Sequence, residues 1–369
     1  MPESQSNSNM TDVGDYLKLF ACTAVMLQTI LVFALTTHPS NQVQIGIGVA
    51  YNLVKFTAPA FIFGILYTTI RTSSASPDYR TYLNTQWHAL LIPTIWWTSI
   101  YLLMMPGVQQ VDHYQTLGQF IWQFINGNAA PHLWYNTMML QFIVLMPLFL
   151  QLVKWCQANP YGGLIALSVT ALVYFGWLWL YDRLVFHGPY MTHWYLLDRF
   201  FLSFIIYGIG GTLTWHYHHL VAQFLQHYWL LLLGVACGSF YWINLELFHF
   251  GLPVKLTNAI YYKPSMTIYD LTIILLILAI AFHQIRQRLA ITRVVHYLAG
   301  FAYKAFLSNV FWQQIYWLSF GKTLVTRNPI VGMIVIYIGT WILSFGSAIG
   351  IHFGWQRLLT WIKKIGIPL

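Results

Sequence analysis

A lysine and a threonine share one face of the first apolar segment, and because polar groups inside a membrane span are costly to bury, they are candidates for a function. Lys18 and Thr29 lie eleven residues apart within residues 16–37, with Cys22 between them. Eleven steps of about 100° return to nearly the same helix face, roughly 16 Å deeper. This places a cation at one mouth and a hydroxyl group inside. Alternatively, Lys18 only anchors the helix end, and Thr29 hydrogen-bonds to its own backbone.

Further polar side chains interrupt the second and ninth apolar segments. Lys55 stands ten residues inside the second segment, too deep for its side chain to reach water easily. In the ninth segment Lys304 and Ser308 are four residues apart, as are Asn309 and Gln313. Residues at this spacing are neighbours on a helix surface. We therefore expect two adjacent ridges that form one polar face.

The surroundings of Lys55 and Lys304 allow two interpretations. Each ammonium group could pair with a buried acid, Glu246 or Asp270, or it could line a hydrated cavity. Because both acids fall near the ends of their segments, we expect a cavity that contains both lysines and opens to the cytoplasmic side. With the polar stripe of the first helix, it would form a buried polar passage running inward from the cytosolic leaflet through the first, second and ninth helices.

Among the 14 histidines, His132 is a candidate functional residue. It precedes Leu133-Trp134-Tyr135 at the start of the fourth apolar segment, beside a loop of residues 106–132 that contains no Lys or Arg. Alternatively, it belongs to an aromatic belt at the membrane surface. The sequence has no H-E-x-x-H motif, paired cysteine spacing, G-x-S-x-G motif or glycine-rich phosphate loop, so we expect no metal site.

The amino-acid composition is that of a membrane protein. Of the 369 residues, 58% are hydrophobic and only 7% are charged, against about 25% charged in a soluble domain. This excludes a disordered chain, a separate soluble domain and, with only three cysteines, a disulfide-stapled scaffold. The net charge of +9 lies mostly at segment ends and does not resemble a nucleic-acid groove. We expect membrane lipids, and no nucleic acid, as partners.

The predicted fold is all-α: a polytopic integral-membrane helical bundle with about 10 transmembrane helices. Residues 1–15 are polar without Lys or Arg and are predicted to be a disordered cytoplasmic tail. Residues 16–353 would form the transmembrane domain, and residues 354–369 an amphipathic cytoplasmic C-terminal segment. Apolar residues at helical spacing in 117–124 predict a short helix on the outer membrane surface. The apolar runs are 16–37, 45–70, 89–105, 133–155, 163–181, 196–215, 226–243, 267–285, 299–320 and 329–352.

The distribution of Lys and Arg predicts the orientation. With the N-terminus inside, ten of these residues fall on the cytoplasmic side and six outside. The loop of residues 106–132, which contains none, then lies outside, in agreement with the positive-inside rule. An even number of spans puts both termini in the cytoplasm.

In order along the chain, these landmarks resemble the integral-membrane acyltransferase 3 family. The resemblance is particularly to its Gram-positive branch, which includes the polysaccharide intercellular adhesin biosynthesis or export protein. The opening helix of the family carries an Arg followed eleven residues later by a His, and Lys18 and Thr29 stand at those positions. Further resemblance lies in residues 56–64, 82–93, 132–135, 207–211 and 303–309, so that about residues 15–350 are covered.

The resemblance implies an acyl transfer reaction. Such proteins take an acyl group, acetyl or succinyl, from a cytoplasmic acyl-CoA-type donor, which acts as a substrate. They deliver it to a hydroxyl of an extracytoplasmic glycan. For this chain we expect a multi-pass protein of the plasma membrane of a Gram-positive bacterium. Its partners would be a cell-envelope glycan or teichoic polymer and an extracytoplasmic or membrane protein that completes the transfer.

The chain departs from the family at its histidine positions, which are Thr29 and Asn309 here. A threonine hydroxyl cannot act as a general base near neutral pH, so the base would be His132, His88 or an inward-facing acid. The departure also favours an alternative, a non-catalytic member that exports or presents a surface polysaccharide. A general channel or transporter lacks support because no internal repeat is visible. The predicted catalytic residues are His132, Thr29 and Asn309, and the predicted substrate-binding residues are Lys18, Lys55, Lys304, Gln313 and Trp134.

Overall fold

The computed structural model describes residues 12–73, 78–111 and 113–364, and it confirms the all-α class. Within those residues there are fifteen α-helices, some short 3₁₀ and π turns, and no β-strand. The helices are α1 (Val13–Leu35), α2 (Asn41–Leu53), α3 (Thr57–Ser73), α4 (Tyr79–Gln86), α5 (Ile92–Met104), α6 (Leu117–Asn126), α7 (Trp134–Val144), α8 (Met146–Ala158), α9 (Gly162–Tyr181), α10 (Ile205–His216), α11 (His218–Phe248), α12 (Pro264–Arg286), α13 (Ile291–Tyr316), α14 (Lys322–Arg327) and α15 (Pro329–Lys364).

Each of the ten apolar runs contains one α-helix or two consecutive α-helices, or part of one, although the first half of the run 196–215 forms 3₁₀ turns. Six segments within the described residues are long and apolar enough to cross a membrane, and a seventh is formed if α7 and α8, bent by 51°, count as one span. The runs on α5 and α10 give helices of only 13 and 12 residues. Helix α13 has 26 residues but is more polar. The structure confirms a polytopic membrane protein, while ten spans and cytoplasmic termini stay predictions.

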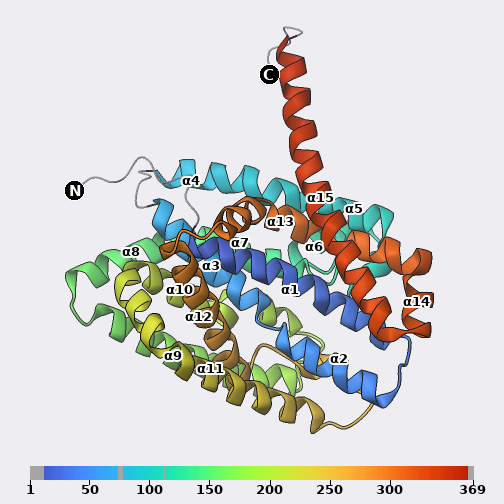
Figure 1. Cartoon of the computed structure of the whole chain (residues 1–369), viewed down its shortest axis with the longest axis horizontal. Helices are drawn as coiled ribbons and strands as arrows, with labels where there is room; N and C mark the ends of the chain where they lie inside the picture. The colour runs from blue at the N-terminus through green and yellow to red at the C-terminus, as the bar shows by residue number, and fades with distance from the viewer. Residues whose placement is uncertain (1–11, 74–77, 112, 365–369) are drawn as a thin grey trace.

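The ends of the chain differ from the predicted boundaries. Helix α1 begins at Val13, so the predicted tail is too long at its C-terminal end, and residues 1–11 lie outside the described part. Helix α15 continues without a break through Gly354, where the separate C-terminal segment was expected to begin. Its C-terminal end leaves the bundle (Figure 1). Residues 365–369 are outside the described part.

The predicted short helix in the loop of residues 106–132 is confirmed as α6. Thr116 caps it: the hydroxyl accepts from the backbone N–H of Gln119, whose side chain accepts in return from the N–H of Thr116. Leu117, Ile121 and Ile125 are exposed along one side. A helix with such a free apolar face is typical of a membrane surface.

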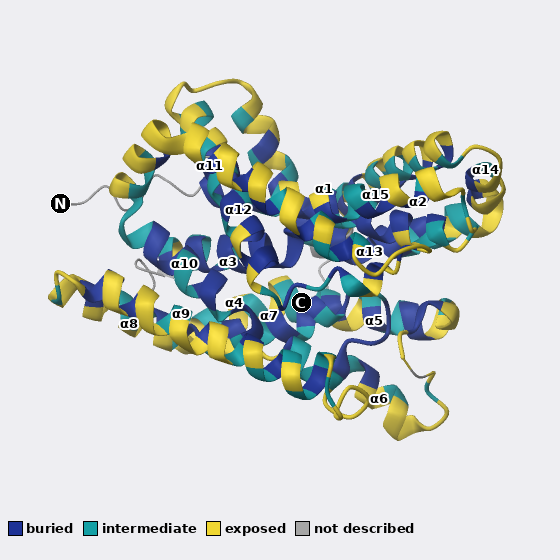
Figure 2. Ribbon diagram, turned by 90° about the horizontal axis from the view of Figure 1, so that it is seen from below, coloured by how far each residue is buried: buried dark blue, intermediate teal, exposed yellow. Residues whose placement is uncertain are grey.

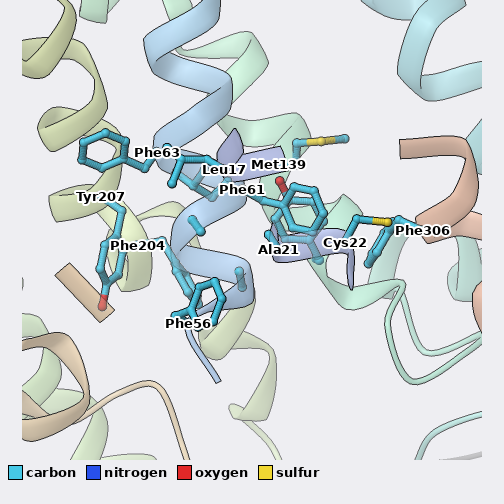
Figure 3. Close-up of a cluster of buried hydrophobic side chains, with 14 of the residues drawn as sticks. Leu17, Ala21, Cys22, Phe56, Phe61, Phe63, Met139, Phe204, Tyr207 and Phe306 are labelled. Atoms are coloured by element: carbon cyan, nitrogen blue, oxygen red, sulfur yellow. The ribbon is translucent and has the colours of Figure 1, made fainter. Parts of the chain in front are cut away.

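Helix α1 is the centre of the bundle and packs against α3, α12, α13 and α15. Figure 3 shows Leu17, Ala21 and Cys22 of α1 among phenylalanines of α3 and α13. Buried residues gather where helices face one another, whereas exposed residues cover the outer faces (Figure 2). Many of the exposed residues are large and apolar, such as Trp96 and Leu172. An apolar exterior suits a protein whose solvent is lipid.

The glycine-rich segment of residues 207–211 is explained by the contact of α10 with α3. A Cβ atom on Gly211 would lie 2.3 Å from the carbonyl oxygen of Phe63. The obstacle is backbone, which cannot move aside as a flexible side chain can. Small residues at such positions let two membrane helices approach closely.

We expect Gly211→Ala to destabilise the protein by about 1–3 kcal/mol, because the added methyl group overpacks the contact of α3 with α10. The measurement is the thermal unfolding midpoint of the purified protein in detergent. Gly234→Ala on α11 is the matched control, since nothing lies within 4 Å of its added Cβ. Equal midpoints for the two variants would contradict the proposed role of Gly211.

Candidate functional site

The second apolar segment is broken between α2 and α3, and Lys55 lies in the break. Pro59 contributes to it, because proline has no N–H to donate to the carbonyl of Lys55 four residues earlier. Gln28 of α1 supplies hydrogen bonds to groups at the break: its Nε2 donates to the carbonyl of Val54 at 2.5 Å and to the Thr57 hydroxyl at 3.2 Å. Irregular backbone inside a membrane protein needs such partners. Lys55 therefore lies in a turn between two helices and not within a regular helix.

The ammonium group of Lys55 is held by two tyrosines. Its Nζ donates to the hydroxyl of Tyr51 at 3.1 Å and lies 4.3 Å from the ring centroid of Tyr261. Ring faces attract cations, more strongly where water is excluded. The residue is only 7% exposed.

The alternative interpretation, in which Lys55 pairs with a buried acid, is wrong. Glu246 pairs instead with Lys263, at 2.5 Å. Asp270 is completely buried and accepts a hydrogen bond from Tyr207 at 3.3 Å. Among the described residues no carboxylate lies within ion-pair distance of Lys55, and Asp270 acts on its charge only from a longer distance.

A cavity of about 550 Å³ brings together four of the predicted site residues: Thr29, Lys55, His132 and Trp134. Its wall combines the C-terminal half of α1, the α2–α3 break, the start of α7 and two loops that contribute Gln110 and Lys255. A volume of this size is typical of a small-molecule or sugar site. The cavity lies at the end of the bundle where α1 finishes.

His132 stands just before α7 and is 3% exposed. Its Nε2 lies 3.3 Å from the carbonyl oxygen of Leu307, which can only accept, so Nε2 carries the proton. Nδ1 then holds a free lone pair, and it has no partner among the described residues. The ring packs edge-on against Tyr101 and Phe306, with centroid distances of 5.4 and 5.0 Å. These contacts fix the ring and leave Nδ1 without a hydrogen-bond partner among the described residues.

Thr29 and Trp134 contribute to different walls of the cavity. Thr29 is 7% exposed and follows Gln28, the residue that caps the α2–α3 break. The indole ring of Trp134 lies 5.9 Å from the ring of Tyr261, centroid to centroid. A hydroxyl group and an aromatic face thus lie in the cavity that contains the lysine and the histidine.

Asn309 and Gln313 do not line this cavity. The Nε2 of Gln313 donates to the carbonyl of Met26 on α1 at 2.8 Å, and the Nδ2 of Asn309 donates to Phe306 in its own helix. Both side chains are fully buried, and their carbonyl oxygens have no partner among the described residues. This ridge of α13 packs against α1.

Lys304 and Ser308 face another way, so the expectation of one polar face on the ninth segment is wrong. They line a second cavity of about 310 Å³ with Trp96, Trp97 and Ile351. The shared cavity predicted for Lys55 and Lys304 is therefore wrong as well. Neighbouring ridges of one helix can face different partners, because the contact is set by how the helix is rotated in the bundle.

Lys18 lies at the opposite end of α1 from the cavity, in a network of charged residues. Its Nζ is 3.6 Å from a carboxylate oxygen of Asp15, whose other oxygen is 2.7 Å from Nδ1 of His296. Beside them Arg71 pairs with Asp12 at 3.1 Å. Burial raises the pKa of the Asp12 carboxyl above its usual range, while Arg71 acts in the opposite direction.

The polar passage predicted along α1 is not continuous. Between Lys18 and Thr29, Ala21 and Cys22 are completely buried in the apolar core, and the Cys22 thiol donates to the carbonyl of Ala302 at 3.1 Å. Close packing of α1 against α13 excludes a polar channel along this stripe. Only the half of the stripe around Thr29 belongs to a cavity.

Sequence reasoning missed several residues of the cavity. Tyr51 had a detectable signal, since it precedes Lys55 by one helical turn. Gln28 is the direct neighbour of Thr29. Lys255 and Tyr261 come from the loop between α11 and α12, and no local spacing pairs them with Lys55. Within the described residues, no group of three or more His, Cys, Asp or Glu side chains could hold a metal ion.

Comparison with known proteins agrees with the resemblance seen in the sequence. A family model described as an acyltransferase domain matches residues 15–349, from the first turn of α1 well into α15. No curated protein and no solved structure matches the chain. Because the match covers nearly the whole helical bundle, the chain belongs to the acyltransferase 3 family, whose members transfer acyl groups in membranes.

Proposed function

We propose that this protein transfers an acyl group, acetyl or succinyl, from a cytoplasmic acyl-CoA-type donor to a hydroxyl of a cell-surface polysaccharide or teichoic polymer. It would do so in the plasma membrane of a Gram-positive bacterium. The observation that carries the proposal is that His132, whose buried Nδ1 has no hydrogen-bond partner among the described residues, lines one cavity with Thr29 and Lys55, in a chain of the acyltransferase 3 family.

His132 is the proposed general base. Its Nδ1 takes the proton from the acceptor hydroxyl as the hydroxyl oxygen attacks the thioester carbonyl carbon. A carbon–oxygen bond forms, the carbon–sulfur bond breaks, and the thiolate leaves with the proton from His132. The hydrogen bond from Nε2 to Leu307 persists through these steps and keeps the ring oriented.

Thr29 has a smaller role in this mechanism. Its hydroxyl can donate a hydrogen bond to the acceptor or to the developing oxyanion, but it cannot take up a proton. Asn309, at the other family histidine position, lies outside the cavity wall and stabilises the packing of α13 instead.

The two ends of α1 suit the two substrates. With the N-terminus in the cytoplasm, the cavity faces outward and receives the acceptor. Lys18 and Arg71 then lie at the cytoplasmic end, where cations can contact the phosphates of the donor. For the direct transfer described above, the thioester end of the donor has to reach the cavity through the bundle, which requires movement of the packed core.

We expect His132→Gln to lower acyl transfer by about 10²–10⁴-fold, because the amide keeps a donor for Leu307 but has no basic nitrogen. The measurement is transfer of label from acetyl-CoA or succinyl-CoA to envelope polymer by the protein in membranes. His88→Gln is the matched control, since His88 is exposed and lines no part of the cavity. Equal activities of the two variants would rule out His132 as the base.

Thr29→Val removes the hydroxyl at nearly constant volume. We expect it to lower the same activity by only about fivefold, the value of one neutral hydrogen bond. Thr29→His tests the alternative function. Activity that appears only in Thr29→His would show that the native chain is not catalytic and would favour a role in polysaccharide export or presentation. A null mutant that alters polymer secretion with acylation unchanged would have the same meaning.

A further inference from the structure

We propose that the acceptor bound in the cavity is anionic: a polyol or sugar unit with a phosphodiester or carboxylate group that pairs with Lys55. That the ligand is the acyl acceptor rests on the proposed function. That it is anionic is inferred from the residues that line the cavity.

The charge of the wall is one-sided. Of the described residues that line the cavity, two are lysines, Lys55 and Lys255, and none is an acid. A cavity lined by one sign of charge with apolar walls attracts the opposite charge. A neutral sugar would leave this positive field unbalanced.

The ammonium group of Lys55 has unused hydrogen-bond donors that a ligand could occupy. An ammonium group has three donors, and only one of them is used in a hydrogen bond, to the Tyr51 hydroxyl. Burying a cation without a counter-ion is costly, and the tyrosines stabilise it only partly. A ligand oxyanion would supply the missing charge, and the proton of the Tyr51 hydroxyl could bond to the same oxyanion.

Asp270 does not take this place. It is completely buried, lies outside the cavity wall and accepts its hydrogen bond from Tyr207. Among the described residues it forms no ion pair with Lys55. Asp270 attracts Lys55 only from beyond ion-pair distance, so the N–H groups of Lys55 that do not bond to Tyr51 can donate to a ligand.

Aromatic residues of the cavity wall contact both the proposed anion site at Lys55 and the proposed base His132. Lys55 lies on the ring of Tyr261, which contacts Trp134, whereas His132 lies against Phe306 on another part of the wall. All these residues line the same cavity. A ligand with its acid group at Lys55 can therefore extend along the aromatic wall and present a hydroxyl toward His132.

Lys255 has a different function. It is exposed in the loop between α11 and α12, at the edge of the cavity. An exposed charge mainly speeds up the approach of an oppositely charged ligand, and salt weakens its effect.

The test is equilibrium binding to the full chain in lipid nanodiscs, without acyl donor. The probes are glycerol 3-phosphate and glucuronate, with glycerol and glucose as their uncharged counterparts. We expect the charged probes to bind at least tenfold more tightly. We expect Lys55→Met to remove this preference and Lys55→Arg to keep it. Lys304→Met, the same change in the other cavity, is the matched control and should bind like the native protein.

Lys255→Gln should weaken binding of the charged probes a few-fold and reduce its salt dependence. This exposed position keeps the proposal testable if Lys55→Met fails to fold. Equal affinities for charged and uncharged probes, or equal behaviour of Lys55→Met and Lys304→Met, would overturn the proposal. Succinate is tested as a further probe, and binding of succinate without binding of glycerol 3-phosphate or glucuronate would assign the charge to the acyl group and would also overturn the proposal.

Failure of this proposal can be distinguished from failure of the proposed function. Selective binding of anionic probes without any acyl transfer would leave the anion site standing and contradict the enzyme. Acyl transfer to neutral glycans, with no competition by anionic ones, would confirm the enzyme and contradict the anion site.

Discussion

A buried ammonium group in an apolar helical bundle is the constraint on which the site depends. Lys55 can stay there only because the break between α2 and α3 brings it to Tyr51 and Tyr261, and because Gln28 satisfies a carbonyl that the break exposes. These groups come from three separate parts of the chain. The cavity therefore exists only once α1, the broken second segment and the loop before α12 have assembled.

The cost of burying charge in an apolar bundle also explains why α1 has three zones of different polarity. Charged residues occupy one end, where Asp15 contacts both Lys18 and His296. Apolar residues fill the middle, and polar groups return around Thr29 at the cavity. This order follows from the low polarity of the membrane interior, which tolerates charge only at an interface or inside a polar cavity. The proposed chemistry needs both ends, one for each substrate.

Loss of the family histidines moves the proposed chemistry from one helix to another. The general base would be His132, at the start of α7, instead of a residue on α1. Its ring is already fixed by Leu307, Tyr101 and Phe306, and a fixed base needs little reorganisation during a reaction. Thr29 and His132 line one cavity, so such a change can leave the acceptor position unaltered.

The sequence by itself determined the solvent, the helices and part of the site. Apolar composition required a membrane, and each of the ten apolar runs contains α-helix, although residues 196–204 form 3₁₀ turns. Lys55 and His132 could be identified as candidates because burying a polar group among apolar neighbours costs free energy, so such a group commonly has a function. Even the break at Lys55 has a local cause in Pro59, although the second segment was expected to be continuous.

Only the tertiary structure decided which side chains meet. The sequence of α13 does not show how the helix is rotated in the bundle, so it could not show that Asn309 faces α1 while Lys304 faces Trp96. Nor could it bring Tyr261 to Lys55, since 206 residues separate them in the chain. Helical periodicity is a local property, whereas a binding cavity is formed by contacts between distant segments, and packing alone selects them.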